Sequence, residues 1–139
     1  MAKGNKKRPR ILITTGLYLI DSNIIIYSVL PENSFLIDLI ETRSPFVSVI
    51  SKIEVLGYHK LSDKQRKQFS LFFDNATLIH ISENIIARAI NMKQKKNISL
   101  ADAVIAASAL ENKLTLITRN TSDFSNIQGL KLENPFNKK

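Results

Sequence analysis

The chain has 139 residues, enough for one domain with a single hydrophobic core. Hydrophobic residues make up 44% of it, so a packed globule is expected rather than a disordered chain. The absence of cysteine excludes disulfide scaffolds and thiolate metal sites, and no apolar run approaches the roughly 20 residues of a membrane span. The net charge of +8 favours a polyanionic partner, although five of the 20 Lys and Arg residues lie within residues 1–10.

Residues 1–16 form a basic extension without helical periodicity. The only apolar stretch, residues 11–13, is shorter than the roughly 7–15 residues of a secretory signal, so a cytoplasmic protein is expected. The sequence leaves open whether the extension is a flexible arm, an upstream translation start or a cloning remnant. As an arm, its cations could contact the phosphates of a polyanionic partner. Residues 17–139 are expected to form a single domain.

From Leu17 onward, short apolar runs alternate with helix-periodic segments. The expected strands are residues 17–20, 46–50, 78–81 and 114–118, with 131–133 as a final edge strand. The expected helices are residues 33–43, 51–60, 63–75, 83–96 and 100–112, the last of them rich in alanine. Parallel neighbouring strands need crossover connections, which are usually helices. The alternation therefore predicts an α/β fold, a three-layer α/β/α sandwich with a mainly parallel central sheet.

Four acidic residues stand out by their positions in this pattern. Asp21 directly follows the first expected strand, and Glu54 lies one helical turn beyond the second. Asp102 lies in the first turn of the alanine-rich helix, and Asp123 lies in the loop after the fourth strand. Ligands of open α/β sheets bind beyond the carboxyl ends of the strands. We therefore expect these four side chains to converge at one edge of the sheet.

Helix capping offers a second interpretation of the same acids. Glu54 and Asp102 each stand three residues after a serine, which is the capping-box pattern, and Asp123 follows Ser122 where another turn could begin. An acid in a first helical turn gains about 0.3–1 kcal/mol from the helix dipole. Capping leaves Asp21 unexplained, because apolar segments flank it on both sides.

Clustered carboxylates would support a specific chemistry. They repel one another and raise each other's pKa, and a divalent cation removes that cost. Magnesium prefers oxygen ligands and keeps several waters. Such an ion can activate water for attack on a phosphodiester, and a second ion can stabilise the leaving oxygen. His59 and His80 are not needed for this reaction and are interpreted as structural or surface residues.

Four segments of the chain, in this order, resemble the motifs of PIN-domain nucleases. They surround the four acids and comprise residues 19–27, 47–57, 100–107 and 116–124, and the ending at residues 127–136 is similar as well. The resemblance extends from about residue 17 to residue 136. Within the family, the chain is most similar to VapC-type toxins, the ribonucleases of bacterial toxin–antitoxin pairs.

This resemblance implies a metal-dependent endoribonuclease. Its catalytic, metal-binding pocket for Mg²⁺ or Mn²⁺ would consist of Asp21, Glu54, Asp102 and Asp123. Supporting or substrate-binding roles would fall to Ser22, Thr118, Arg119 and Asn120. Arg119 is expected either to approach a phosphate or to form a salt bridge. The resemblance also implies a homodimer that is silenced by a cognate antitoxin protein.

Two other functions stay open at this point. The domain could be a PIN ribonuclease of RNA maturation or quality control that has no antitoxin. It could also be a catalytically silent RNA-binding module, although the presence of an acid at all four motif positions argues against this. An aspartate phosphatase is disfavoured, because Ser22 and Asn23 follow Asp21 where that class carries a second aspartate.

Overall fold

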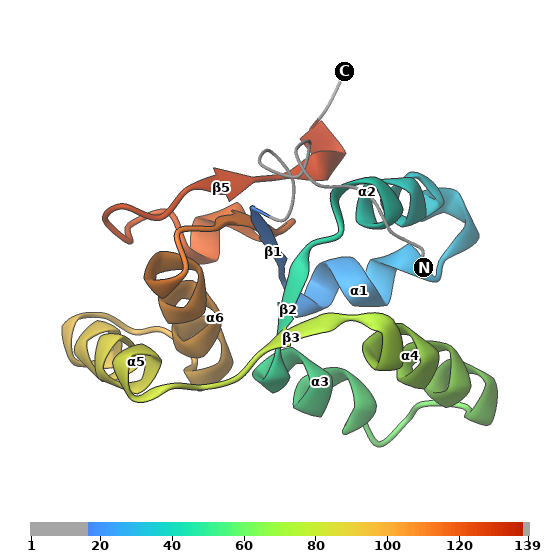
Figure 1. Cartoon of the computed structure of the whole chain (residues 1–139), viewed down its shortest axis with the longest axis horizontal. Coiled ribbons are helices and arrows are strands. Elements are labelled where there is room, and N and C mark those ends of the chain that lie inside the picture. Colours follow the sequence, from blue (N-terminus) through green and yellow to red (C-terminus); the bar gives the residue numbers. More distant parts are fainter. Residues whose placement is uncertain (1–16, 138–139) are drawn as a thin grey trace, which may run out of the picture.

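The computed structural model describes residues 17–137, so the expectations for residues 1–16 lie outside the described part. The strands are β1 (Tyr18–Ile20), β2 (Phe46–Ser48), β3 (Thr77–Ile79), β4 (Thr115–Ile117) and β5 (Leu132–Glu133) (Figure 1). The α-helices are α1 (Ser22–Ser28), α2 (Phe35–Arg43), α3 (Val49–Leu56), α4 (Asp63–Asn75), α5 (Glu83–Lys95) and α6 (Leu100–Glu111). Short 3-10 helices are η2 (Pro31–Asn33), η3 (Thr121–Asp123) and η4 (Pro135–Asn137).

The five strands form one sheet in the order β3-β2-β1-β4-β5. Every pairing between neighbours is parallel. The chain runs outward from β1 through β2 to β3 and then returns to β4 on the other side of β1. The strand order therefore reverses between β1 and β4, at the centre of the sheet. The predicted α/β fold with a parallel sheet is confirmed.

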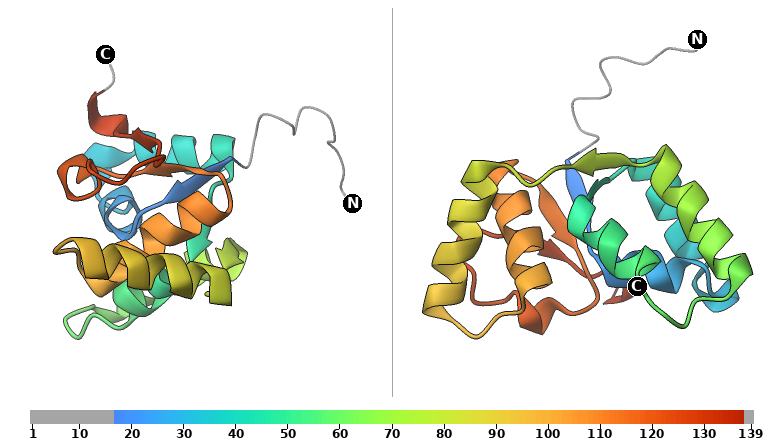
Figure 2. Two further views of the ribbon diagram at one scale, coloured as in Figure 1. Left: turned by 90° about the vertical axis from the view of Figure 1, so that its left-hand side faces the viewer. Right: turned by 90° about the horizontal axis from the view of Figure 1, so that it is seen from below.

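Helices cover both faces of this sheet, which gives the three layers (Figure 2). Because successive strand residues point to opposite faces, the two faces have separate cores. Leu19 and Leu116 pack with α5 and α6. Ile20 and Ile117 pack on the opposite face with α1 to α4. All four side chains are fully buried, so the central strands are fixed on both sides.

The sequence pattern did not predict α1. Its residues include Ile24, Ile25 and Ile26, and β-branched side chains are more typical of strands. Ile24 and Ile25 are fully buried in the core beside α2 and α3. Tertiary packing therefore outweighs local propensity in this segment. The second strand also ends earlier than expected, because the Ser48 hydroxyl accepts a hydrogen bond from the Ile50 backbone N at 3.1 Å and starts α3 there.

The alanine-rich helix α6 is buried along most of its length, as its small side chains predict. Ala103, Ala106, Ala107 and Ala109 are all fully buried.

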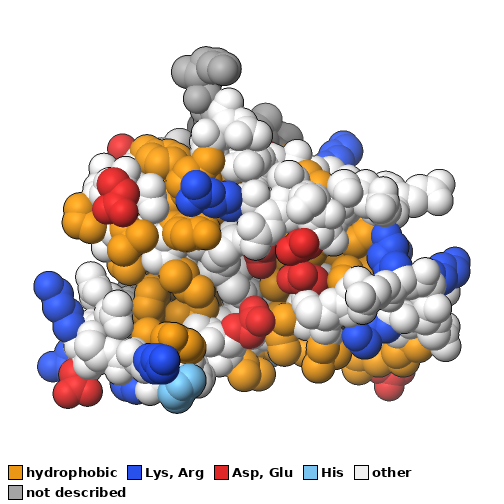
Figure 3. Space-filling view, turned by 180° about the vertical axis from the view of Figure 1, so that it is seen from behind, with side chains coloured by type: hydrophobic (Ala, Val, Ile, Leu, Met, Phe, Trp, Pro, Cys, Tyr) orange, Lys and Arg blue, Asp and Glu red, His pale blue; other side chains and the backbone are white. Residues whose placement is uncertain are grey.

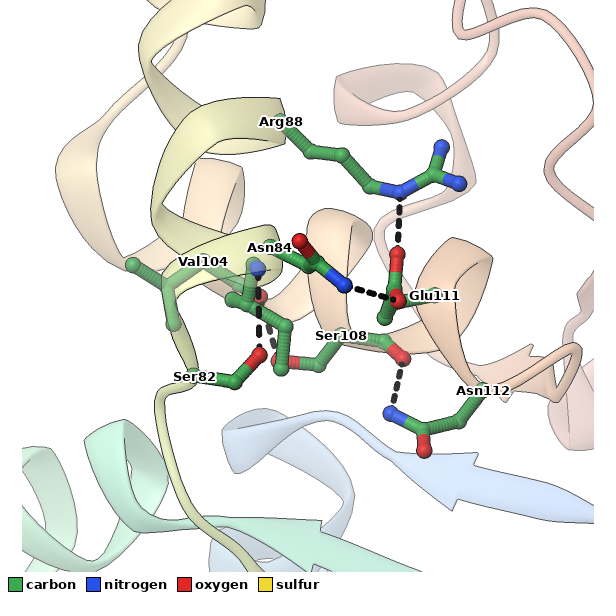
Figure 4. Close-up of polar contacts among 8 residues, drawn as sticks. Ser82, Asn84, Arg88, Val104, Ser108, Glu111 and Asn112 are labelled. Carbon is green, nitrogen blue, oxygen red and sulfur yellow. Dashed lines mark hydrogen bonds and ion pairs between the residues drawn. The ribbon is translucent and has the colours of Figure 1, made fainter.

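Polar side chains of α5 also contact the end of α6 (Figure 4). The Arg88 guanidinium lies 2.8 Å from Glu111, whose other carboxylate oxygen accepts from Asn84 at 3.1 Å. These contacts fix the helix whose first turn carries Asp102. Within residues 17–137, no helix has the length and hydropathy that crossing a membrane requires.

Candidate active site

The carboxyl ends of β1 and β4 meet where the strand order reverses, which is where open α/β sheets bind ligands. Ile20 and Ile117 are partners in the register, so the next residues, Asp21 and Thr118, lie side by side. The backbone continues the ladder there: Asp21 N donates to Ile117 O at 2.9 Å. A carboxylate and a hydroxyl are thus placed at this edge by the two central strands.

Asp21 is buried, with 5% of its surface exposed. Its Oδ1 accepts from the backbone N of Ser22 at 2.7 Å, and its Oδ2 accepts from Thr118 Oγ1 at 2.7 Å. Burial raises the pKa of Asp21 to about 6, although both hydrogen bonds act to lower it, and the nearby charges of Asp102 and Glu54 raise it further. Asp21 is also the N-cap of α1. The expectation that capping does not apply to Asp21 was therefore wrong, because α1 itself was not predicted.

Glu54 lies exposed on α3. Its Oε1 accepts from Ser22 Oγ at 2.7 Å, and Ser22 Oγ also hydrogen-bonds to Ser51 Oγ at 2.8 Å. The capping-box interpretation of Glu54 is wrong, because the N-cap of α3 is Ser48 and Ser51 lies inside the helix. Glu54 is therefore held by a side chain of α1 rather than by its own helix end.

Asp102 and Asp123 face a shared polar pocket. The Ser99 hydroxyl caps α6 by accepting from the Asp102 backbone N at 3.1 Å, so capping is confirmed at this helix start. Burial raises the pKa of the Asp102 carboxyl, opposed by hydrogen bonding with Ser99, and the charges of Asp123 and Glu54 raise it further. Asp123 ends η3 and is exposed. The pocket has a volume of about 460 Å³, and its other lining residues include Lys96, Asn97, Ser122 and Asn126.

The four acids thus share one electrostatic neighbourhood. Asp21 is influenced by Asp102 and Glu54, and Asp102 by Asp123 and Glu54. Acidic side chains gather near the middle of the back of the molecule, with basic side chains to either side (Figure 3). Within residues 17–137, however, no three acidic or histidine side chains are arranged as a ready metal site. The carboxylates are neighbours at this edge without forming a complete set of ligands.

Thr118 connects several polar groups of this edge. It is fully buried, and besides donating to Asp21 its Oγ1 accepts from the Asn120 backbone N at 3.0 Å and from Asn23 Nδ2 at 3.4 Å. Asn120 lies in the same turn after β4 as Thr118, and Asn23 lies in α1. Thr118 therefore fixes the orientation of the Asp21 carboxylate.

The chain matches the sequence profile of the PIN domain over residues 18–130. It belongs to the PIN-domain family. Its fold is similar to a toxin–antitoxin complex from Klebsiella pneumoniae, with 32% identity, a TM-score of 0.68 and coverage of 85% of this chain and 97% of that chain. No curated protein is significantly similar to it in sequence.

Two further solved structures have the same fold. One is VapBC2 from Rickettsia felis bound to a promoter DNA fragment, with 22% identity, a TM-score of 0.72 and coverage of 84% of this chain and 97% of that chain. The other is FitAcB from Neisseria gonorrhoeae, with 22% identity, a TM-score of 0.70 and coverage of 87% and 99%. The predicted resemblance to PIN domains and VapC-type proteins is confirmed.

Arg119 of this PIN domain does not form the salt bridge that was one of its two expected contacts. Within residues 17–137, the ion pairs join Arg43 to Glu133 and Arg88 to Glu111. The Arg119 guanidinium carbon instead lies 4.1 Å from the ring centroid of Phe136 and 4.9 Å from that of Tyr27. The charged guanidinium therefore lies against two aromatic rings.

Sequence reasoning missed two polar residues of this PIN-domain site, Asn23 and Ser51. Asn23 hydrogen-bonds to Thr118 Oγ1, and its Oδ1 accepts from the Arg119 backbone N at 3.4 Å. Its place two residues after Asp21 was the available signal, but it has meaning only once α1 is known to be a helix. Ser51 was interpreted as a cap, and its burial inside α3 shows that it supports Ser22 instead.

Proposed function

We propose that this PIN domain is a Mg²⁺- or Mn²⁺-dependent endoribonuclease and the toxin of a toxin–antitoxin pair. Two observations carry this proposal. Asp21 and Glu54 share Ser22 as a hydrogen-bond partner beside the reversal point of the sheet, and Asp102 and Asp123 line one polar pocket. Capping accounts for Asp21 and for the backbone of Asp102. It accounts neither for Glu54 nor for the raised pKa values of Asp21 and Asp102.

The proposed metal ligands are Asp21, Glu54, Asp102 and Asp123. Carboxylate oxygens of this kind suit hard divalent cations. Such a cation would supply Lewis-acid activation of water and would offset phosphate charge. Residues of this chain orient two of the carboxylates in advance: Thr118 and the Ser22 backbone hold Asp21, and the Ser22 hydroxyl holds Glu54.

RNA is the proposed substrate, and basic side chains flank the acidic group on the same face (Figure 3). The toxin role is supported by the 32% identical relative, which is described as a toxin–antitoxin complex. A ribonuclease of RNA maturation would use the same chemistry. The two roles differ only in whether an antitoxin protein binds and inhibits the chain.

A homodimer and a bound antitoxin are proposed on two further surfaces. A groove of about 270 Å³ between α5 and α6 has Lys93 as its only charged or polar lining residue and is otherwise lined by Ile50, Ile81, Ile86, Ala89, Ile90, Leu100 and Val104. A pocket of about 400 Å³ beside α2 and α4 mixes apolar with polar residues, including Ile37, Ile40, Glu41, Phe72 and Asn75. Homodimer interfaces are the more apolar class, so we assign the groove to the dimer and the mixed pocket to the antitoxin.

The deciding experiment replaces the carboxylate at the centre of the site. We expect Asp21→Asn to lower RNA cleavage by more than about a hundredfold while the protein stays folded, because the substitution removes a metal ligand. Asp74→Asn, an exposed acid on α4, serves as the control and should cleave normally. Cleavage is measured with Mg²⁺ and with EDTA, and fragments formed after brief expression are sequenced. Cleavage that survives both Asp21→Asn and EDTA would contradict the metal mechanism.

A further inference from the structure

Arg119 is an exposed cation directly beside the acidic edge, and its position is fixed at several atoms. It follows Thr118, the partner of Asp21. Its backbone N donates to Asn23 Oδ1 at 3.4 Å, and its backbone O accepts from Asn134 Nδ2 at 3.4 Å. Its guanidinium lies 4.1 Å from the Phe136 ring centroid and 4.9 Å from that of Tyr27. Both the backbone and the charged end are therefore held.

The aromatic support comes from two distant parts of the chain. Phe136 belongs to η4 near the C-terminal end, and its backbone N donates to Asn134 Oδ1 at 2.9 Å. Its ring packs edge-on against Tyr27 of α1 and Phe35 of α2, with centroids 5.7 Å and 5.3 Å apart. This packing holds the Phe136 ring, so the surface on which the Arg119 guanidinium lies is fixed before any ligand arrives.

An arginine held in this way keeps its binding capacity. Contact with an aromatic face occupies the plane of the guanidinium and leaves its N–H edges available. Within residues 17–137, neither ion pair involves Arg119, so no carboxylate there neutralises it. A free guanidinium edge matches the oxygens of a phosphate by two parallel hydrogen bonds. Less side-chain freedom is lost on binding when the group is already oriented.

The guanidinium also lies on the side of the site where Asp21 is held. Arg119 directly follows Thr118, whose hydroxyl donates to Asp21 Oδ2 at 2.7 Å. Tyr27, against which the guanidinium lies, belongs to the helix that Asp21 caps. An RNA strand bound at the acidic edge therefore has this cation beside it.

We propose that Arg119 binds a phosphate of the RNA strand held at the acidic edge, and that Phe136, together with Tyr27, is a positioning residue for Arg119. This inference rests on the proposed ribonuclease function and deepens it. The short helix η4, which carries Phe136, is then part of the substrate-binding surface, although it contributes no acid to the site.

The test measures binding of a fluorescein-labelled, mixed-sequence single-stranded RNA to the full-length protein in EDTA, where cleavage is prevented. We expect Arg119→Gln to weaken binding about tenfold, the usual effect of a lost charge-assisted hydrogen bond. It should also lower the slope of log affinity against log salt by about 0.7, because one phosphate contact is lost. The control is Arg66→Gln, which removes an exposed arginine of α4 that donates to Leu56 O.

The second set of variants tests the positioning role. Phe136→Leu keeps an apolar side chain but removes the aromatic face, and it should weaken binding about threefold with an unchanged salt slope. Added to Arg119→Gln, it should cause no further loss, because both changes act through one contact. Phe136→Tyr should restore binding. Tyr58→Leu, which removes an exposed aromatic ring packed on His59, is the control for loss of an aromatic side chain.

The outcomes separate the inference from the function on which it rests. If the wild type cleaves RNA with Mg²⁺ but Arg119→Gln binds RNA as well as Arg66→Gln does, the inference alone is overturned. If adding Phe136→Leu to Arg119→Gln weakens RNA binding by the same factor as Phe136→Leu does alone, the positioning role is overturned. If the wild type cleaves no RNA under any condition, the proposed function fails and the inference fails with it.

Discussion

Asp21 combines two roles that local sequence rules treat as alternatives. It accepts a hydrogen bond at the start of α1, as an N-cap does. It is nevertheless so buried that its pKa is raised to about 6, against an ordinary value of 3.8. A carboxyl that served only as a cap would have a lower free energy at the surface, because burial disfavours its charged form. A strongly shifted pKa at the carboxyl edge of a sheet, beside other acids, is typical of a functional residue.

The raised pKa of Asp21 predicts how the stability of the metal-free protein depends on pH. Between about pH 4 and pH 6 the folded state binds more protons than the unfolded state, so the free energy of unfolding falls as pH rises through this window. Asp21→Asn cannot ionise, so it should remove this slope and raise the free energy of unfolding at pH 7 by about 1–3 kcal/mol. Urea unfolding in EDTA at pH 4.5 and 7 measures both effects.

The control for this prediction is the exposed acid Asp74. Asp74→Asn should keep the wild-type slope, because this side chain lies in solvent on α4. If the wild type and Asp21→Asn lose stability equally between the two pH values, the burial of Asp21 does not have the effect described here.

At the level of elements, the start of α6 separates capping from ligand binding. Ser99 Oγ accepts from the backbone N of Asp102, so the cap uses the main chain of that residue. The Asp102 carboxyl is half-buried at the polar pocket shared with Asp123. Capping and the proposed metal binding would therefore use different atoms of the same residue, and neither interpretation excludes the other.

This separation predicts opposite effects for two substitutions. Ser99→Ala should lower the free energy of unfolding by about 0.5–2 kcal/mol, through loss of the cap, and should leave Mg²⁺ affinity nearly unchanged. Asp102→Asn keeps the backbone N that Ser99 accepts from. It should retain stability but weaken Mg²⁺ binding by at least about tenfold. Urea unfolding and isothermal titration with Mg²⁺ measure the two effects.

Ser82→Ala on α5 is the matched control, because Ser82 Oγ caps its helix in the same way, accepting from Ile85 N at 3.2 Å. It should resemble Ser99→Ala in stability and the wild type in Mg²⁺ binding. Equal loss of Mg²⁺ affinity in Ser99→Ala and Asp102→Asn would show that the cap and the ligand cannot be separated.

For the whole molecule, the arrangement of apolar surface is more informative than net charge. The +8 charge is concentrated toward the first ten residues, so the proposal of an RNA substrate depends on the acidic edge and on family membership instead. Exposed apolar side chains on α5 and α6 include Ile86, Ile90 and Leu100. A monomer rarely leaves such side chains contiguous unless they bind another protein.

The proposed dimer can be tested by adding charge to this groove. Wild-type protein should have twice the mass of one chain in light scattering, and Ile90→Glu should have the mass of a single chain, because dimerisation would have to remove the charged carboxylate from water. Leu71→Glu is the control: Leu71 is 64% exposed on α4, away from the groove, and its substitution should leave the dimer intact. A wild-type monomer, or a dimer that tolerates Ile90→Glu, would contradict the assignment.

The sequence by itself determined the features that depend on local pattern. Apolar residues at helical spacing predicted the bounds of α4, and those of α5 and α6 to within a residue. The pattern is clear there because each helix buries one continuous stripe of side chains or is buried throughout. The alternation of strands and helices required crossovers and hence a parallel sheet. The order of the four acids along these elements was enough to predict that they lie at one edge.

Only the tertiary structure decided what depends on contacts between distant residues. Helix α1 forms although it contains three isoleucines, because two of them are buried in the core. Helix propensity, which is a local property, does not predict this. Asp21 gains its shifted pKa from burial and meets Thr118, 97 residues away, because β1 and β4 are neighbours. Arg119 rests on Phe136 because η4 packs against α1 and α2. Burial and long-range pairing are properties of the whole fold, so they appear only once the chain is packed.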